Sequence, residues 1–117
     1  MKAAVLGYSG CSTCRKALAW LKMHGVEVTE RAIVDDPPTL KELEQWVPAS
    51  GLLVKKWLNT SGLSYRALGK EKVDAASDET LIKWLSADGK LVKRPVLVHG
   101  KKVLVGFNEQ AYAELFG

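Results

Sequence analysis

Two cysteines, Cys11 and Cys14, are the residues of this chain whose types and spacing are best suited to chemistry. They follow the turn residues Ser9-Gly10, and the apolar run 3–6 just before that turn predicts a buried strand. Behind them, apolar residues recur at positions 14, 17, 18 and 21, which is the spacing of an amphipathic helix. The pair is therefore predicted to lie where a strand turns into a helix.

This placement favours thiol chemistry. The N-terminus of a helix carries a partial positive charge and unpaired N–H groups, and both favour a thiolate over a thiol. Arg15 and Lys16 add two full positive charges directly after the pair. We therefore expect a lowered pKa for Cys11, with Cys14 within reach of it for a disulfide. The sequence predicts a redox site, with Cys11 as nucleophile and Cys14 as resolving thiol.

Two other interpretations of the cysteine pair are open. A structural zinc site needs four ligands, and the other candidates, His24 and His99, have no partner at ligand spacing. We therefore expect no metal site. The second alternative is a pair of inert buried thiols, since free cysteine is often simply part of a core. The placement of Cys-X-X-Cys at a strand–helix junction favours the redox pair over both.

The composition indicates one domain spanning residues 1–117. At 47% hydrophobic and 26% charged residues, the chain is long enough to bury a core. It has no apolar run of the roughly 18 residues that cross a membrane and no signal peptide, so we expect a cytoplasmic protein without a membrane partner. The net charge of +4 is spread over scattered doublets. This pattern favours a small anionic substrate or an acidic protein partner over direct nucleic-acid binding, and we expect a monomer.

The predicted order of elements is strand–helix–strand, then a helical block, then strand–strand–helix. A second strand is expected over 26–34, and Thr39 is expected to cap a helix that Pro48 to Gly51 interrupt. Shorter helices are predicted over 52–58 and 64–69, whereas 70–76 show no clear period. A longer helix is predicted to begin at Ser77 or Asp78 and to stop at position 88.

The end of the chain returns to strands. Residues 96–99 and 102–105 are predicted to form a hairpin, and Asn108 is expected to cap a last helix. With Cys-X-X-Cys at the first strand–helix junction, this layout predicts an α/β protein of thioredoxin-like (glutaredoxin-like) fold. We expect a four-stranded mixed sheet with a helical insertion at about residues 39–87.

Arg94-Pro95 opens the third predicted strand. In a thioredoxin-like fold a proline at this place lies beside the cysteines, and we expect its peptide bond to be cis, which is uncommon for proline bonds in general. Arg94 is then predicted to direct its guanidinium at an anion that meets Cys11.

Four motifs carry a resemblance to a known family. They are Cys11-Ser12-Thr13-Cys14-Arg15-Lys16-Ala17, Asn59-Thr60-Ser61-Gly62 with Tyr65-Arg66, Lys93-Arg94-Pro95, and Val105-Gly106-Phe107-Asn108-Glu109. In their order and spacing they resemble the arsenate reductase/Spx family over essentially the whole chain. The similarity is closest to its small bacterial arsenate reductase-like proteins.

One branch of that family consists of enzymes. In glutaredoxin-linked arsenate reductases, the cysteine that matches Cys11 attacks arsenate, and three arginines hold the oxyanion. Arg94 matches one of these arginines, while Asn59 falls at or next to the second position and Gly106 at the third. The candidates to supply the missing charge are Lys55, Lys56 and Arg66. We expect catalytic roles for Cys11, Cys14 and Arg94, and substrate-binding roles for Ser12, Thr13, Arg15, Pro95 and Asn59.

The same resemblance implies the reductant. No cofactor is expected to be bound, and glutathione, glutaredoxin or thioredoxin would complete the reaction. The leading hypothesis is a thiol–disulfide oxidoreductase that passes through a mixed disulfide with glutathione or a protein partner.

The other branch consists of Spx-type regulators. There, a Cys-X-X-Cys that matches Cys11 and Cys14 is a redox switch, and the domain binds the C-terminal domain of the RNA polymerase α subunit. Gly51 is a candidate match for a glycine at the polymerase contact. The alternative hypothesis is therefore a polymerase-binding regulator without turnover. A third possibility, a binding module with vestigial cysteines, predicts an ordinary Cys11 pKa of about 8.5.

Overall fold

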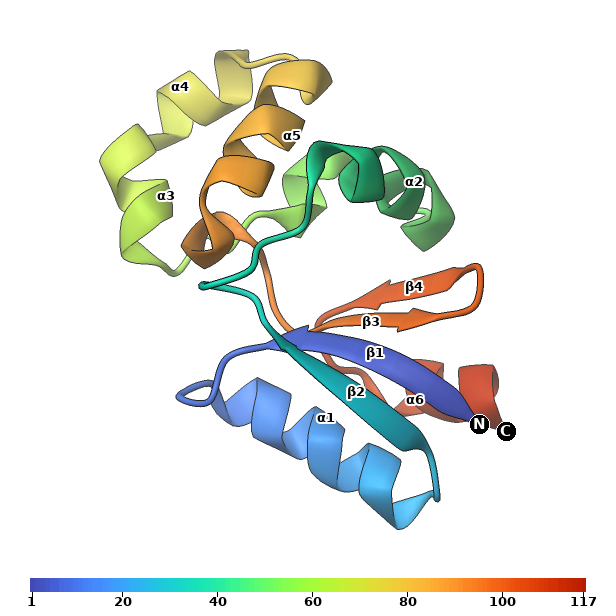
Figure 1. Cartoon of the computed structure of the whole chain (residues 1–117). Coiled ribbons are helices and arrows are strands. Elements are labelled where there is room, and N and C mark those ends of the chain that lie inside the picture. The colour runs from blue at the N-terminus through green and yellow to red at the C-terminus, as the bar shows by residue number, and fades with distance from the viewer. The chain divides into compact units, whose positions relative to one another are not determined.

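The computed structural model describes all residues from 1 to 117 (Figure 1). The chain forms two compact units. The first unit comprises Met1–Ala32 and Arg94–Gly117, and the second comprises Ile33–Lys93. The first contains all four strands, together with two helices, and the second is helical. No helix in either unit combines the length and the apolar character that crossing a membrane requires.

The sheet of the first unit is mixed. Its strands are β1 (Lys2–Gly7), β2 (Glu27–Ala32), β3 (Val96–His99) and β4 (Lys102–Val105), in the spatial order β2-β1-β3-β4. Strand β1 is parallel to β2 and antiparallel to β3, and β3 and β4 form an antiparallel hairpin. These strands confirm the predicted four-stranded mixed sheet and the thioredoxin-like fold.

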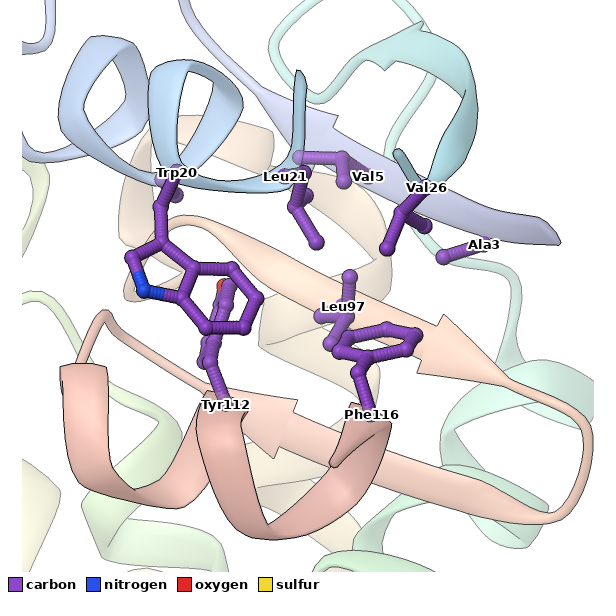
Figure 2. Close-up of a cluster of buried hydrophobic side chains, with 9 residues drawn as sticks. Ala3, Val5, Trp20, Leu21, Val26, Leu97, Tyr112 and Phe116 are labelled. Carbon is purple, nitrogen blue, oxygen red and sulfur yellow. The ribbon is translucent and has the colours of Figure 1, made fainter. Parts of the chain in front are cut away.

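Two helices cover one face of this sheet. Helix α1 (Ser12–Met23) connects β1 to β2, and α6 (Glu109–Phe116) follows β4; both lie on the same side of the sheet in Figure 1. Between the helices and the sheet lies a core in which Trp20 meets Tyr112 edge-on, with 5.6 Å between ring centroids (Figure 2). Its other members are Ala3, Val5, Ala17, Leu21, Val26, Leu97 and Phe116. This packing fixes α1, and therefore its N-terminus, against the sheet.

The ends of α1 and α6 follow from their capping residues. Cys11 is the N-cap of α1, and after the C-cap residue His24 the backbone of Gly25 takes a φ of +72°, a conformation that favours glycine. Asn108 caps α6, because its side-chain oxygen accepts the N–H of Ala111 at 3.0 Å. The cap by Asn108 was predicted from the sequence, as was the position of the cysteine pair where the first strand turns into a helix.

The second unit begins with α2 (Leu40–Ser50). Thr39 caps this helix in a reciprocal capping box with Glu42, as the sequence predicted for Thr39. The predicted interruption at Pro48 was wrong, because the helix continues through the proline and ends at Gly51, whose φ is +72°. A proline this close to the end of a helix removes a single backbone donor, and the last turn tolerates that loss.

The remaining elements of the second unit are short. They are the 3₁₀ turn η1 (Val54–Trp57), α3 (Leu63–Leu68), α4 (Lys70–Ala75), α5 (Asp78–Ala87) and the 3₁₀ turn η2 (Gly89–Leu91). Ser77 caps α5 through its side chain, as predicted. The segment predicted as a helix over 52–58 forms only a 3₁₀ turn, and α4 was missed. Val73 is the one buried residue of α4, so its sequence has no apolar period to detect.

Candidate thiol site

The sulfur of Cys11 occupies the acceptor position at the start of α1. Cys11 has an extended backbone, and its Sγ accepts the backbone N–H of Cys14 at 3.3 Å. Its own N–H donates to the carbonyl of Tyr8 at 3.0 Å, and its carbonyl accepts the N–H of Arg15 at 3.1 Å. A side-chain acceptor at this position normally comes from Ser, Thr, Asp or Asn. Here the sulfur takes that role, so an N–H of the helix terminus points at the thiol.

Cys14 lies one helical turn further along and faces inward. Its side chain is 2% exposed. The absence of a side chain at Gly7 leaves the necessary room, because a Cβ there would lie 3.3 Å from the Cys14 Sγ. Cys11 is only partly buried, and both residues are free thiols. The pair therefore has one accessible sulfur and one enclosed sulfur.

The surroundings shift the two thiol pKa values in opposite directions. Partial burial alone raises the pKa of Cys11, but hydrogen bonds from the Cys14 side chain and backbone, together with the hydrogen bonding and charge of Arg94, lower it below its ordinary value. Burial raises the pKa of Cys14 to about 11, and the hydrogen bond and negative charge of Cys11 add to this effect. Cys11 is thus the thiol that ionises first.

Arg94 and Pro95 approach the cysteines from the start of β3. The Arg94–Pro95 peptide bond is cis, which confirms the prediction. Pro95 is buried, and its carbonyl accepts the N–H of Gly106 at 2.8 Å. The guanidinium carbon of Arg94 lies 5.0 Å from the ring centroid of Tyr8. Its Nη1 atom is buried and has no hydrogen-bond acceptor in the protein.

Comparison with known proteins identifies the family. The ArsC family matches residues 6–115. The chain belongs to the ArsC family. A solved structure described as a putative ArsC family related protein from Bacteroides fragilis is similar to this chain with a TM-score of 0.93 and 47% identity, over 98% of each chain. A solved possible arsenate reductase from Streptococcus mutans has a TM-score of 0.87 and 39% identity, over 97% of this chain and 96% of that one.

Regulators of transcription also match this ArsC-family chain. The global transcriptional regulator Spx of Staphylococcus saprophyticus is 30% identical over 99 residues, which cover 85% of this chain and 75% of the regulator. The family therefore includes relatives described as reductases and relatives described as regulators, as the resemblance implied.

The other predicted residues of the first unit lie at the start of α1. Ser12 is exposed and Thr13 is partly buried. The Nη1 of Arg15 donates to the carbonyl of Ser9 at 2.9 Å. Arg94, and not Arg15, is the arginine whose charge lowers the pKa of Cys11. The predicted substrate-binding roles of Ser12, Thr13 and Arg15 stay predictions.

Asn59 belongs to the second unit and is held by its own neighbours there. Its N–H donates to the carbonyl of Leu91 at 2.7 Å, and its Nδ2 approaches the carbonyl of Lys90 at 3.5 Å. Its predicted role in binding the substrate stays a prediction.

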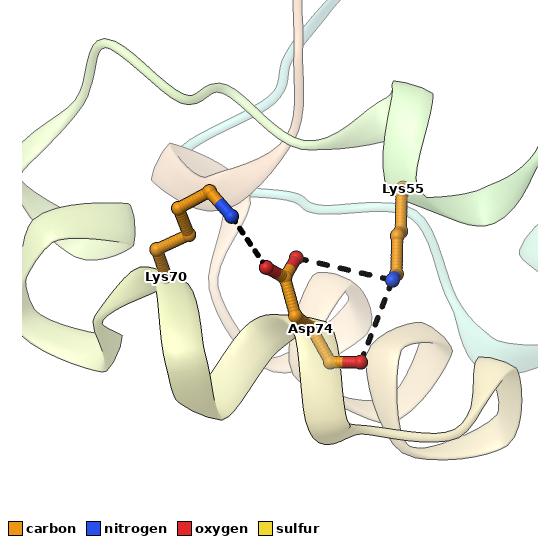
Figure 3. Close-up of polar contacts among 3 residues, drawn as sticks. All are labelled: Lys55, Lys70 and Asp74. Carbon is orange, nitrogen blue, oxygen red and sulfur yellow. Dashed lines mark hydrogen bonds and ion pairs between the residues drawn. The ribbon is translucent and has the colours of Figure 1, made fainter.

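Lys55, a candidate for the missing positive charge, is paired within the second unit. Its Nζ lies 3.8 Å from Asp74 Oδ1 and 3.5 Å from the carbonyl of Asp74, while Lys70 Nζ lies 2.7 Å from Asp74 Oδ2 (Figure 3). The hydrogen bond and charge of Lys70, with the charge of Lys55, lower the pKa of the Asp74 carboxyl. Any anion bound by Lys55 would compete with this carboxylate.

The two histidines are engaged by the backbone. The Nδ1 of His24 lies 2.8 Å from the carbonyl of Trp20, and the Nδ1 of His99 lies 2.7 Å from the carbonyl of Lys2. The structure contains no group of three or more His, Cys, Asp or Glu side chains that could hold a metal ion.

Sequence reasoning missed two tyrosines that bear on this site. The ring of Tyr8 makes a cation–π contact with Arg94, and Tyr112 is fully buried with a hydroxyl that has no hydrogen-bond partner. Burial raises the pKa of Tyr112, and the charge of a Cys14 thiolate adds to this shift. The sequence did place Tyr8 directly before the Ser9-Gly10 turn, but only the fold brings Arg94 to it.

Proposed function

We propose that this ArsC-family chain is a cytoplasmic thiol–disulfide oxidoreductase in which Cys11 is the nucleophile and Cys14 the resolving thiol. The proposal rests on the opposite environments of the two thiols, which differ in exposure and in the direction of their pKa shifts. Cys11 is accessible, accepts a helix N–H and has a lowered pKa, whereas Cys14 is 2% exposed and has a pKa raised to about 11. A nucleophile has to be a thiolate that substrate can reach, and a resolving thiol has to stay protonated until the substrate is bound.

The reaction proceeds by two exchanges. The Cys11 thiolate attacks the glutathione sulfur of a glutathionylated protein, so that a Cys11–glutathione disulfide forms and the protein leaves as a thiolate that takes up a proton. Cys14 then loses its proton and attacks Cys11 Sγ, which forms the Cys11–Cys14 disulfide and releases glutathione. A reduced glutaredoxin or thioredoxin supplies the two electrons that restore both thiols.

Arg94 supports this chemistry as an electrostatic partner. Its guanidinium lowers the pKa of Cys11, and its buried Nη1 offers a donor that no protein group uses. A developing thiolate or a bound anion would accept that hydrogen bond, which is strong because the donor is charged.

Disulfides fit this site better than arsenate does. Among the positions of the three oxyanion-binding arginines of arsenate reductases, Arg94 matches one, and Asn59 and Gly106 stand at or next to the others. Each lost charge-assisted contact weakens anion binding by about 1.5–3 kcal/mol. The similarity to a possible arsenate reductase still makes arsenate the natural comparison substrate.

The test compares two matched variants on a glutathionylated peptide. Wild type, Cys11→Ser and Cys14→Ser are supplied with reduced thioredoxin, and release of the peptide thiol above that of a blank with thioredoxin alone is measured. We expect Cys11→Ser to abolish release and Cys14→Ser to accumulate a glutathione adduct on Cys11, detected by mass spectrometry. Unchanged turnover in Cys11→Ser would contradict the proposal.

A regulator without turnover is the second candidate function, favoured by one surface feature. After the helix end at Gly51, Leu52 is 40% exposed and Leu53 is 75% exposed. Exposed leucines next to each other suit a protein contact, and the Spx relative is a transcriptional regulator. Capture of the RNA polymerase α C-terminal domain by the oxidised or the reduced protein would support this function, and no capture in either state would contradict it.

A further inference from the structure

Tyr8 and Arg94 form a cation–π pair near Cys11. Tyr8 follows β1, and Arg94 precedes β3, so the two residues come from segments far apart in the sequence. The guanidinium carbon lies 5.0 Å from the centroid of the Tyr8 ring, within the distance at which the face of the ring attracts a cation. The ring is 46% exposed, so it lies at the outer edge of the site.

The contact with the Tyr8 ring accounts for the buried donor that Arg94 keeps without an acceptor. Nη1 is buried and has no hydrogen-bond partner in the protein. A flexible arginine side chain would ordinarily turn such a donor toward water, because a buried unpaired charge is costly. Contact with the ring restrains the guanidinium, which carries the N–H groups. The charge of the same guanidinium lowers the pKa of Cys11.

The loop that carries Tyr8 is shaped to place the ring there. The carbonyl of Tyr8 accepts the N–H of Cys11 at 3.0 Å, which fixes its backbone next to the nucleophile. A Cβ on Gly10 would lie 2.8 Å from Cε1 and 3.1 Å from Cζ of Tyr8. The missing side chain of Gly10 therefore leaves the space that the ring occupies.

We propose that Tyr8 is a positioning residue that holds the Arg94 guanidinium against Cys11, and that its aromatic ring, not its hydroxyl, does so. No hydrogen bond of the structure involves the hydroxyl of Tyr8, whereas the ring makes the contact with Arg94. This inference rests on the proposed function in one respect, which is that Arg94 assists the Cys11 thiolate.

The test measures the pH profile of Cys11 alkylation by iodoacetamide, with Cys11 identified by mass spectrometry. Loss of the ring in Tyr8→Leu should move the midpoint of the profile to higher pH and slow alkylation below the midpoint about two- to five-fold. Tyr8→Phe keeps the ring and should retain the wild-type profile. Gly10→Ala keeps Tyr8 but displaces the ring, so it should shift the profile in the same direction as Tyr8→Leu.

Arg94→Met separates the two proposals. If Arg94→Met raises the midpoint and neither Tyr8→Leu nor Gly10→Ala does so, the positioning role is overturned while the proposed function stands. If Tyr8→Phe shifts the profile as far as Tyr8→Leu, the hydroxyl acts and the inference about the ring is overturned. An ordinary midpoint in the wild type, unmoved by Arg94→Met, would overturn both the inference and the proposed function.

Discussion

The backbone N–H of Cys14 donates a hydrogen bond to the sulfur of Cys11 over 3.3 Å. This one contact caps the N-terminus of α1 and also contributes to the difference in pKa between the two thiols. The donor group stabilises negative charge on Cys11, and a charged Cys11 in turn makes ionisation of Cys14 harder. The end of a helix therefore sets the order in which the two cysteines can react.

Selective alkylation should reveal this order directly. Alkylation follows the thiolate fraction, so a lowered pKa moves the reaction of Cys11 to lower pH and a raised pKa moves that of Cys14 to higher pH. With a pKa of about 11, Cys14 is ionised to roughly one part in ten thousand at neutral pH. We expect iodoacetamide to label Cys11 alone near neutrality, as measured by peptide mass spectrometry.

The control for that experiment is a protein with one thiol. Cys11→Ser leaves only Cys14, which should stay unlabelled in the folded protein and react once the protein is unfolded in urea. Rapid labelling of Cys14 in folded Cys11→Ser at neutral pH would contradict the assignment of roles.

Removal of the Tyr112 hydroxyl should stabilise the protein. Tyr112 is fully buried, and its hydroxyl has no hydrogen-bond partner. A buried polar group without a partner costs about 1–3 kcal/mol, whereas its ring packs against Trp20 and Phe107. Tyr112→Phe keeps the ring and should raise the free energy of unfolding by about that amount, measured by urea denaturation.

A second tyrosine provides the matched control. Tyr8 is 46% exposed, so Tyr8→Phe should change the free energy of unfolding by less than about 0.5 kcal/mol. A loss of stability in Tyr112→Phe would mean that the hydroxyl makes a favourable contact, and the expectation would then be wrong.

The sequence predicted the parts of the fold that depend on local patterns. A hairpin pattern placed β3 and β4, and capping residues placed the starts of α2, α5 and α6 at Thr39, Ser77 and Asn108. The cis bond before Pro95 was predicted from the expected fold and is confirmed. Each of these features is encoded within a few residues, or follows once the fold is known.

The features that were missed depend on contacts between distant segments. Helix α4 buries only Val73, so no periodicity reveals it. The contact between Tyr8 and Arg94 exists because β1 and β3 are neighbours in the sheet, and no local pattern records it. Pro48 is the opposite case, because a proline is a strong local signal for the end of a helix and α2 nevertheless continues through it.

The two lysines beside Asp74 should be distinguishable by titration. Lys70 hydrogen-bonds to the Asp74 carboxyl at 2.7 Å and is the main cause of its lowered pKa, whereas Lys55 acts only by charge from 3.8 Å. Lys70→Ala should therefore raise the Asp74 pKa more than Lys55→Ala does, as followed by NMR of the carboxyl carbon. Added salt should reduce both effects, and equal shifts in the two variants would contradict this ranking.

Gly89 should be the glycine of the second unit that least tolerates alanine. A Cβ there would collide with the carbonyl oxygen of Ile33 and would lie 2.7 Å from its carbonyl carbon and 2.9 Å from Val34 Cα. These are backbone atoms, which cannot rotate away, so Gly89→Ala should destabilise the protein by about 1–3 kcal/mol or more.

At Gly62, the matched control, the nearest atom is Nδ2 at the end of the Asn59 side chain. That end can move, so Gly62→Ala should cost less than about 1 kcal/mol. Both substitutions reduce the conformational freedom of the unfolded chain to the same extent. The difference between the two variants in the free energy of unfolding, measured by urea denaturation, therefore reports the steric clash at Gly89. Equal losses of stability would show that the backbone around Gly89 can shift to accommodate the Cβ.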